Sequence, residues 1–197
     1  ALSTAFIAPS LYQLYDPYSG NSELKPEENQ SLEFGLVFNG FDWEFSSTYF
    51  QRIEDPSLIY DLSSYRYENA NKNARYTGVE TQILGWISEK LKISEQLTFT
   101  QTKNGDLRYL PKFSSQSQIT YNLSEQLQSN LRFQVIGERF GLDNKTILKK
   151  YQLINFSIQY QLKNKPLRFF IHATNLFNVS YIEIESYETR GRNLVGG

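Results

Sequence analysis

Apolar side chains occupy alternate positions along most of this chain. Within residues 32–38 every even-numbered residue is Leu or Phe, and after Asn39-Gly40 the alternation resumes at Phe41 and continues to Tyr49, with Ser47 as its one polar member. A period of two indicates β-strands that have one apolar face. Asn-Gly between two such runs is the strongest short-range signal for a hairpin. The sequence therefore predicts an antiparallel hairpin at this point.

The same alternation predicts about ten strands along the chain and no helix. The predicted runs are Leu2–Ile7, Glu28–Phe38, Phe41–Arg52, Ala74–Ile87, Leu91–Lys103, Phe113–Leu123, Leu127–Glu138, Tyr151–Leu162, Leu167–Asn175 and a last run from Thr189 to the end. The complete runs are as long as a tilted strand needs to cross a bilayer, which is about 9–11 residues or slightly more. No interdomain linker interrupts them, so we expect all-β architecture in a single domain.

The segments that link these runs are alternately short and long. The short links are Asn39-Gly40, Ser88–Lys90, Ser124–Gln126 and Lys163–Pro166, and the long links are Ala8–Pro26, Ile53–Asn73, Asn104–Lys112, Gly137–Lys150 and Leu176–Glu188. Antiparallel strands with this alternation have all tight turns at one end and all long loops at the other. Bacterial outer-membrane barrels are built this way, with short periplasmic turns and longer extracellular loops.

Polar and charged side chains fill the parity opposite to the apolar one. Its titratable members include Glu33, Glu44, Glu80, Arg132, Arg168 and His172. Such a face fits a water-filled lumen better than a packed core, so the pattern predicts an antiparallel transmembrane β-barrel with an apolar outside and a polar inside. We interpret the charges as a lattice that solvates the inner wall and contacts whatever fills the lumen. A ligand path along the wall is the alternative.

Composition excludes several classes of function. The net charge is −1 and the pI is about 6.0, which leaves no electrostatic footprint for nucleic acid. No apolar run reaches the roughly 18 residues of a membrane helix. Without cysteine there is no disulfide or thiol nucleophile, and a single histidine gives neither a transition-metal constellation nor a catalytic triad. We therefore predict no catalytic residue, no metal site and no cofactor, and interpret His172 as a hydrogen-bonded wall contact.

The beginning and end of the chain suggest that it is a piece of something larger. It starts at Ala1 without a methionine or a signal-peptide pattern, and it contains no methionine at all. Its last residues, Gly191–Gly197, end on Gly-Gly without the terminal aromatic residue typical of outer-membrane barrels. We expect a fragment of a larger barrel, while a closed ten-stranded barrel stays open as an alternative.

Three groups of motifs, in order, carry a resemblance to a known family. The first group runs from Phe6-Ile7-Ala8-Pro9-Ser10 through Leu14-Tyr15, Gly20-Asn21 and Leu24-Lys25-Pro26-Glu27 to Glu33-Phe34-Gly35. The second group is Tyr67-Glu68-Asn69 followed by Ala74-Arg75-Tyr76-Thr77-Gly78-Val79-Glu80. The third group is Ala173-Thr174-Asn175-Leu176-Phe177-Asn178, then Tyr181, then Gly191-Arg192-Asn193. Together they resemble the TonB-dependent outer-membrane receptors. The resemblance implies that residues 1–197 are the C-terminal portion of a 22-stranded barrel domain in the bacterial outer membrane. It also implies partners: membrane lipid, the missing strands, a plug in the lumen and the TonB energy-transducing complex, which acts through the missing N-terminal part.

Within the family, the segments 12–27 and 55–61 look most like the cobalamin-transporter branch, although siderophore receptors share much of the pattern. We expect ligand contacts on the long loops, which are rich in aromatic and cationic residues. The candidates are Tyr15, Tyr18, Tyr60, Tyr65, Tyr67, Arg139, Phe140, Tyr181, Tyr187 and Arg190. The predicted function is energised uptake of a scarce nutrient, cobalamin or a ferric siderophore, without catalysis. A standalone small barrel acting as an enzyme or adhesin is the alternative from another class.

Overall fold

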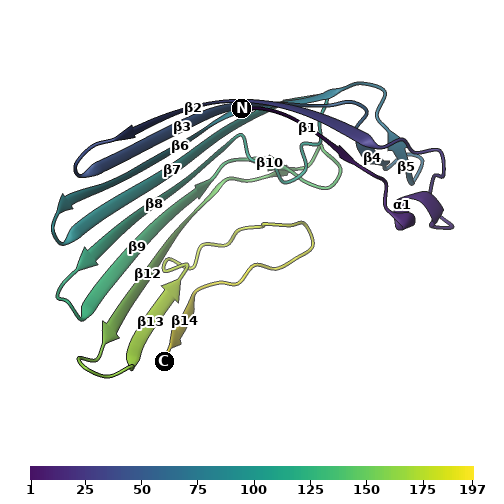
Figure 1. The fold of residues 1–197 in the computed structure, drawn as a ribbon. Coiled ribbons are helices and arrows are strands. Elements are labelled where there is room, and N and C mark those ends of the chain that lie inside the picture. Colours follow the sequence, from purple (N-terminus) through teal and green to yellow (C-terminus); the bar gives the residue numbers. More distant parts are fainter.

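The computed structural model describes all residues from Ala1 to Gly197, and its main feature is one curved, open antiparallel sheet (Figure 1). Ten strands lie side by side in the order β1-β2-β3-β6-β7-β8-β9-β12-β13-β14. Their bounds are β1 Leu2–Ile7, β2 Glu27–Asn39, β3 Trp43–Glu54, β6 Ala74–Ser88, β7 Leu91–Lys103, β8 Phe113–Asn122, β9 Leu127–Ile136, β12 Tyr151–Gln161, β13 Arg168–Thr174 and β14 Asn193–Gly196. Chain neighbours pair with one another, as they do in an up-and-down barrel wall.

The sheet does not close on itself. β1 forms one edge and β14 the other, and neither edge pairs with anything. A closed ten-stranded barrel is therefore not what this chain forms, and that alternative was wrong. An open sheet of this kind fits part of the wall of a larger barrel, because a transmembrane sheet must pair every edge.

The predicted strands agree closely with the observed ones. The first nine have both ends within two residues of their predicted ends, and Leu91–Lys103 matches at both. The last differs: β14 begins at Asn193 instead of Thr189, because the segment before it is an irregular loop that follows β13.

Three small structures lie in segments that we predicted as long loops. They are the helix α1 (Leu11–Tyr15), the hairpin of β4 (Leu58–Asp61) and β5 (Arg66–Asn69), and the hairpin of β10 (Arg139–Phe140) and β11 (Ile147–Leu148). All are at the end of the sheet opposite the tight turns (Figure 1). The prediction of no helix was wrong. A capping box starts α1, since Ser10 and Gln13 bond each other's backbone N–H groups.

The two faces of the sheet differ in chemistry as the alternation predicts. Rows such as Phe34–Tyr49–Val79–Phe99 pair across β2, β3, β6 and β7 and define the outer face, where Phe34 is 63% exposed. The opposite, inner face is polar. Only 16 of the 197 residues are buried, so the sheet has almost no packed core. Its cohesion comes from the backbone ladder, since 85 of the 112 hydrogen bonds between backbone groups lie within the strands and the helix. No helix here is long and apolar enough to span a bilayer.

Polar side chains interrupt the apolar band of the outer face near its middle. Ser47 and Thr81 share a hydrogen bond of 3.0 Å between their hydroxyl oxygens, and the Ser115 hydroxyl donates to Glu95 Oε1 at 2.9 Å. The register places all four side chains on the outer face, on neighbouring strands from β3 to β8. Pairing within the sheet satisfies these polar groups where water is scarce.

Candidate functional site

The inner face brings the six predicted luminal residues onto one wall, and five of them line three hollows. Glu33 and Glu80 line a hollow of about 680 Å³, and Arg132 and His172 line another of about 300 Å³. Arg168 lines a third hollow, of about 800 Å³, at the tight-turn end. The sixth, Glu44, pairs in register with Asn39 and Leu84 beside the first tight turn and lines none of these hollows.

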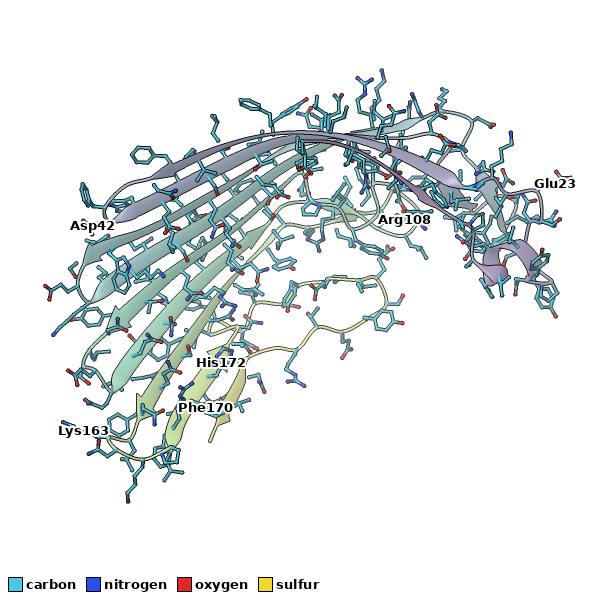
Figure 2. The ribbon with its side chains drawn as sticks, viewed as in Figure 1. Glu23, Asp42, Arg108, Lys163, Phe170 and His172 are labelled. Carbon is cyan, nitrogen blue, oxygen red and sulfur yellow. The ribbon has the colours of Figure 1, made fainter.

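His172 lies among amides and hydroxyls. It faces Ser157 across the β12–β13 pair, and Figure 2 labels it on β13. Its hollow also contains Asn155 and Arg132, whose Nη2 donates to Gln118 Oε1 at 3.2 Å. Hydroxyls lie beside the ring, but no carboxylate lines this hollow to complete a Ser-His-acid triad. Nowhere in the chain do three or more His, Cys, Asp or Glu side chains gather as metal ligands would.

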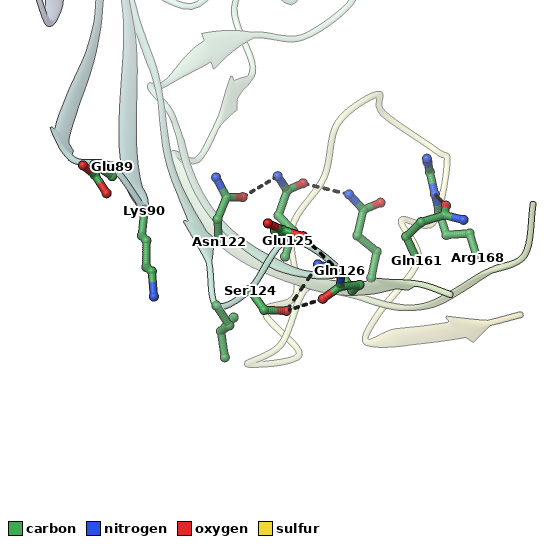
Figure 3. A pocket seen from close by; sticks show the side chains of 11 residues that line it. Glu89, Lys90, Asn122, Ser124, Glu125, Gln126, Gln161 and Arg168 are labelled. Carbon is green, nitrogen blue, oxygen red and sulfur yellow. Dashed lines mark hydrogen bonds between the residues drawn. The ribbon is translucent and has the colours of Figure 1, made fainter. Parts of the chain in front are cut away.

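At the tight-turn end, a row of amides crosses the wall from β8 to β12 (Figure 3). Gln128 Nε2 donates to Asn122 Oδ1, and Gln159 Nε2 donates to Gln128 Oε1, both at 2.8 Å. The row lines the 800 Å³ hollow together with Gln161 and Arg168, and only one lining residue is hydrophobic. Each amide leaves some donors and acceptors unused, so the row can bind water or the polar surface of a protein in the lumen.

At the opposite end, two loops that are distant in sequence are joined by hydrogen bonds. Lys25 N donates to Asn69 Oδ1 at 2.8 Å, while Asn69 Nδ2 donates back to Lys25 O at 3.0 Å. Arg66 Nη2 donates to Gly20 O at 3.0 Å, and Tyr67 N donates to Ser19 O at the same distance. The loop after β1 and the β4–β5 hairpin therefore form one unit, which we call the stapled loops (residues 19–25 and 66–69).

Aromatic rings gather beside the stapled loops. Tyr67 lies edge-on to both Tyr60, at 5.0 Å between ring centroids, and Tyr12, at 6.1 Å. Tyr15, Tyr18 and Tyr65 point into solvent, between 67% and 89% exposed, and join no ring cluster. Of the predicted tyrosines on this side, the structure thus brings together only Tyr60 and Tyr67.

The other predicted loop residues lie around the β10–β11 hairpin and the loop before β14. Arg139 is 95% buried there: its Nη2 donates to Ile182 O at 2.6 Å, and its guanidinium lies 5.0 Å above the ring of Tyr151, which stacks at 4.4 Å on Tyr181. Arg139 fastens the loop and presents no free charge. Phe140 pairs with Ile147 inside the hairpin, whereas Tyr187 and Arg190 are exposed.

A pocket that we did not predict lies between β4, the loop of residues 104–108 and the β10–β11 turn. It measures about 360 Å³, and its polar lining includes Glu54, Tyr60, Asp61, Tyr76, Asn104, Asp106, Arg108, Asp143 and Asn144. Within it, Arg108 Nε donates to both carboxylate oxygens of Asp106, at 2.9 and 2.8 Å. Burial alone would raise the pKa of Asp106, but the hydrogen bonds from Arg108 outweigh it and lower that pKa. Sequence gave no signal for this pocket beyond the polar composition of three separate loops.

Comparison with known proteins decides the family. The family model described as TonB dependent receptor-like, beta-barrel, matches residues 1–176. The chain belongs to the TonB-dependent receptors. Members of this family are outer-membrane proteins of Gram-negative bacteria that act as receptors and transporters, so the predicted family and location are confirmed.

Individual relatives of this TonB-dependent receptor chain carry different ligands in their names. The vitamin B12 transporter BtuB of Vibrio cholerae is 27% identical over 169 residues, which cover 80% of this chain and 27% of the relative. The copper transporter OprC superposes with a TM-score of 0.83 at 18% identity, over 98% of this chain and 35% of that one. The siderophore receptor PirA from Pseudomonas aeruginosa gives 0.75 at 23% identity, over 98% and 34%. The chain thus spans between a quarter and about a third of these proteins, and the solved structures establish the fold alone.

Proposed function

We propose that residues 1–197 are the C-terminal portion of the barrel domain in a receptor that imports a scarce nutrient across the outer membrane. In this proposal the complete barrel has 22 strands, a plug occupies its lumen, and the TonB complex supplies energy through the plug-bearing part. The polar inner wall supports a lumen that holds protein and water. The two unpaired edges, β1 and β14, support further strands on both sides.

We further propose cobalamin as the ligand, on the strength of the match to the vitamin B12 transporter over most of this chain. The tyrosine cluster beside the stapled loops favours it as well. Cobalamin is large, with an aromatic base and amide-rich edges, and the rings of Tyr12, Tyr60 and Tyr67 offer apolar area with hydrogen-bonding tips. In addition, Arg139 is buried and so adds no exposed cation to the mouth, where an anionic ligand would need one.

A ferric siderophore is the second candidate. It is favoured by the resemblance in fold to the siderophore receptor PirA and to a ferric enterobactin receptor, with TM-scores of 0.75 and 0.80. An anionic iron complex would need cations at the mouth. Arg190 is exposed there, whereas Arg108 is already paired with Asp106.

The test uses the full-length receptor in detergent, titrated separately with cyanocobalamin and with ferric enterobactin. We expect tight binding of cyanocobalamin, weakened by about 2–4 kcal/mol when Tyr60 and Tyr67 are both replaced by Ala, because buried aromatic anchors carry much of the energy of an interface. Tyr121→Ala, on the outer face near a tight turn, is the matched control and should leave the affinity unchanged. The variant His172→Ala should also bind normally.

Two outcomes would redirect the proposal. Tight binding of the iron complex with none of cyanocobalamin would assign the receptor to siderophores. Binding of neither would refute both ligands while leaving the family assignment intact.

A further inference from the structure

Two basic side chains lie directly opposite each other at the loop end of the outer face. Arg75 on β6 pairs in register with Lys103 on β7, and both are exposed. Neither forms an ion pair; the two ion pairs of the chain are Arg52–Glu54 and Arg108–Asp106. Like charges directly opposite on adjacent strands repel each other. The repulsion between Arg75 and Lys103 therefore destabilises this part of the sheet, and an anion bound between the two side chains would remove it.

The height of this pair on the wall is also informative. Two rows nearer the tight turns, Val79 pairs with Phe99 on the apolar band. β7 has 13 residues from Leu91 beside the turn to Lys103. At about 3.3 Å per residue and a tilt near 40°, this strand climbs roughly 30 Å, slightly more than the apolar band of about 25 Å. Lys103 and Arg75 thus stand just beyond the hydrocarbon, at the level of the outer-leaflet headgroups.

The surroundings of the pair suit an anion. In the row between the pair and the apolar band, Thr77 lies opposite Gln101, so that a hydroxyl and an amide add hydrogen-bond donors. Further along the same end of the sheet, Lys112 and Lys150 directly precede β8 and β12, and both are exposed and outside any ion pair.

We propose that Arg75 and Lys103 bind the phosphate of a phosphorylated lipid in the outer leaflet. A phosphate offers three acceptor oxygens, enough for a guanidinium and an ammonium at once. A lipid fits better than free phosphate because its acyl chains would lie along Val79 and Phe99 on the same strands. Basic side chains at a membrane surface each add to the attraction for anionic headgroups. The proposal does not depend on which nutrient the receptor carries.

The test is native mass spectrometry of the full-length receptor with lipid A, which carries phosphates, and with the same lipid after enzymatic dephosphorylation. The double variant Arg75→Gln/Lys103→Gln should bind lipid A roughly tenfold to thirtyfold more weakly, as expected for the loss of two headgroup contacts. Lys90→Gln/Lys163→Gln, which removes two exposed cations at the tight-turn end, is the matched control and should bind like the wild type. Dephosphorylated lipid should bind equally weakly to all three proteins.

Several results would overturn the proposal. One is an unchanged affinity of the double variant for lipid A, and another is an equal loss of affinity in the control variant. A third is complete displacement of lipid A by millimolar inorganic phosphate, which would indicate a site for the free anion. If the double variant fails to fold, as judged by heat-modifiable migration on a gel, Lys103→Gln and Lys103→Arg replace it. Loss of binding in the first and retention in the second would support the proposal, and equal binding by both would refute it.

Discussion

For a single side chain, the face of the strand determines its surroundings. Ile158 and Gln159 are neighbours on β12, yet Ile158 pairs with Ile171 on the outer face and Gln159 joins the amide row of the inner face. Lipid offers no partner for a charge, while the lumen offers water and polar groups.

The matched substitutions Ile158→Arg and Gln159→Arg test this difference directly. We expect Ile158→Arg to destabilise the full-length receptor by about 2–4 kcal/mol, the cost of an arginine near the midplane of a lipid-facing wall. Gln159→Arg should fold almost normally despite losing one hydrogen bond of the row. The measurement is urea unfolding in lipid vesicles, and equal damage by both variants would contradict the assignment of the faces.

Glu95 shows which part of a residue's role the sequence predicts: the face of the sheet, but not the contact across strands. The alternation itself places Glu95 on the outer face, between Ile93 and Leu97. It cannot reveal that Ser115 donates to this carboxylate, because that contact depends on the register between β7 and β8. Register follows from turn geometry and from the pairing of whole strands, which no single strand contains.

At the scale of elements, long strands were predictable and short elements were not. An alternation repeated over ten or more residues identifies β2 or β7, whereas four residues in β4 or five in α1 cannot be distinguished from loop by periodicity. The capping-box pattern of Ser10 and Gln13 was a usable signal for α1. The two hairpins form because contacts with other loops hold them in place. The pocket that contains Asp106 depends on the same kind of contact between loops.

The loop of Asp106 and Arg108 has a predictable pH dependence. The pKa of Asp106 lies below its ordinary value of 3.8 in the folded protein. A lowered pKa means that the ion pair stabilises the loop fully above that ordinary value and loses this effect as the pH falls through the folded value. A spin label at Leu107→Cys should therefore stay ordered at pH 3.8 and become mobile only as the pH falls from there through the lower folded pKa of Asp106, and Asp106→Asn should make it mobile at neutral pH.

The control for this experiment is the same label at Ser63→Cys, in the turn between β4 and β5. This label should not respond to Asp106→Asn. Unchanged mobility of the Leu107 label in the Asp106→Asn variant would show that the ion pair does not order the loop.

At the scale of the whole molecule, the sheet depends on strands outside it. Sequence predicted an outer-membrane barrel wall, and it placed the long loops together at one mouth. It could not separate Tyr60 and Tyr67, which form a cluster, from Tyr15 and Tyr18, which are in solvent, since ring contacts depend on how the loops fold over one another.

The open edges lead to a prediction for residues 1–197 expressed alone. Unpaired backbone groups on β1 and β14 are not tolerated in lipid. We expect the isolated polypeptide to aggregate or to migrate identically with and without heating on a gel. A compact, heat-modifiable, protease-resistant band would show that ten strands suffice for a barrel.

The hydrogen bonds that join residues 19–25 to 66–69 have a further consequence if these loops face the cell exterior, as the long loops of outer-membrane barrels do. An antibody or phage that binds this part of the receptor would contact a discontinuous epitope, made of two segments more than forty residues apart in the sequence. A linear peptide vaccine copied from either segment would present only half of that epitope. Conversely, a substitution at Asn69 would alter both segments of the epitope, because the side-chain amide of Asn69 is hydrogen-bonded to the backbone of Lys25.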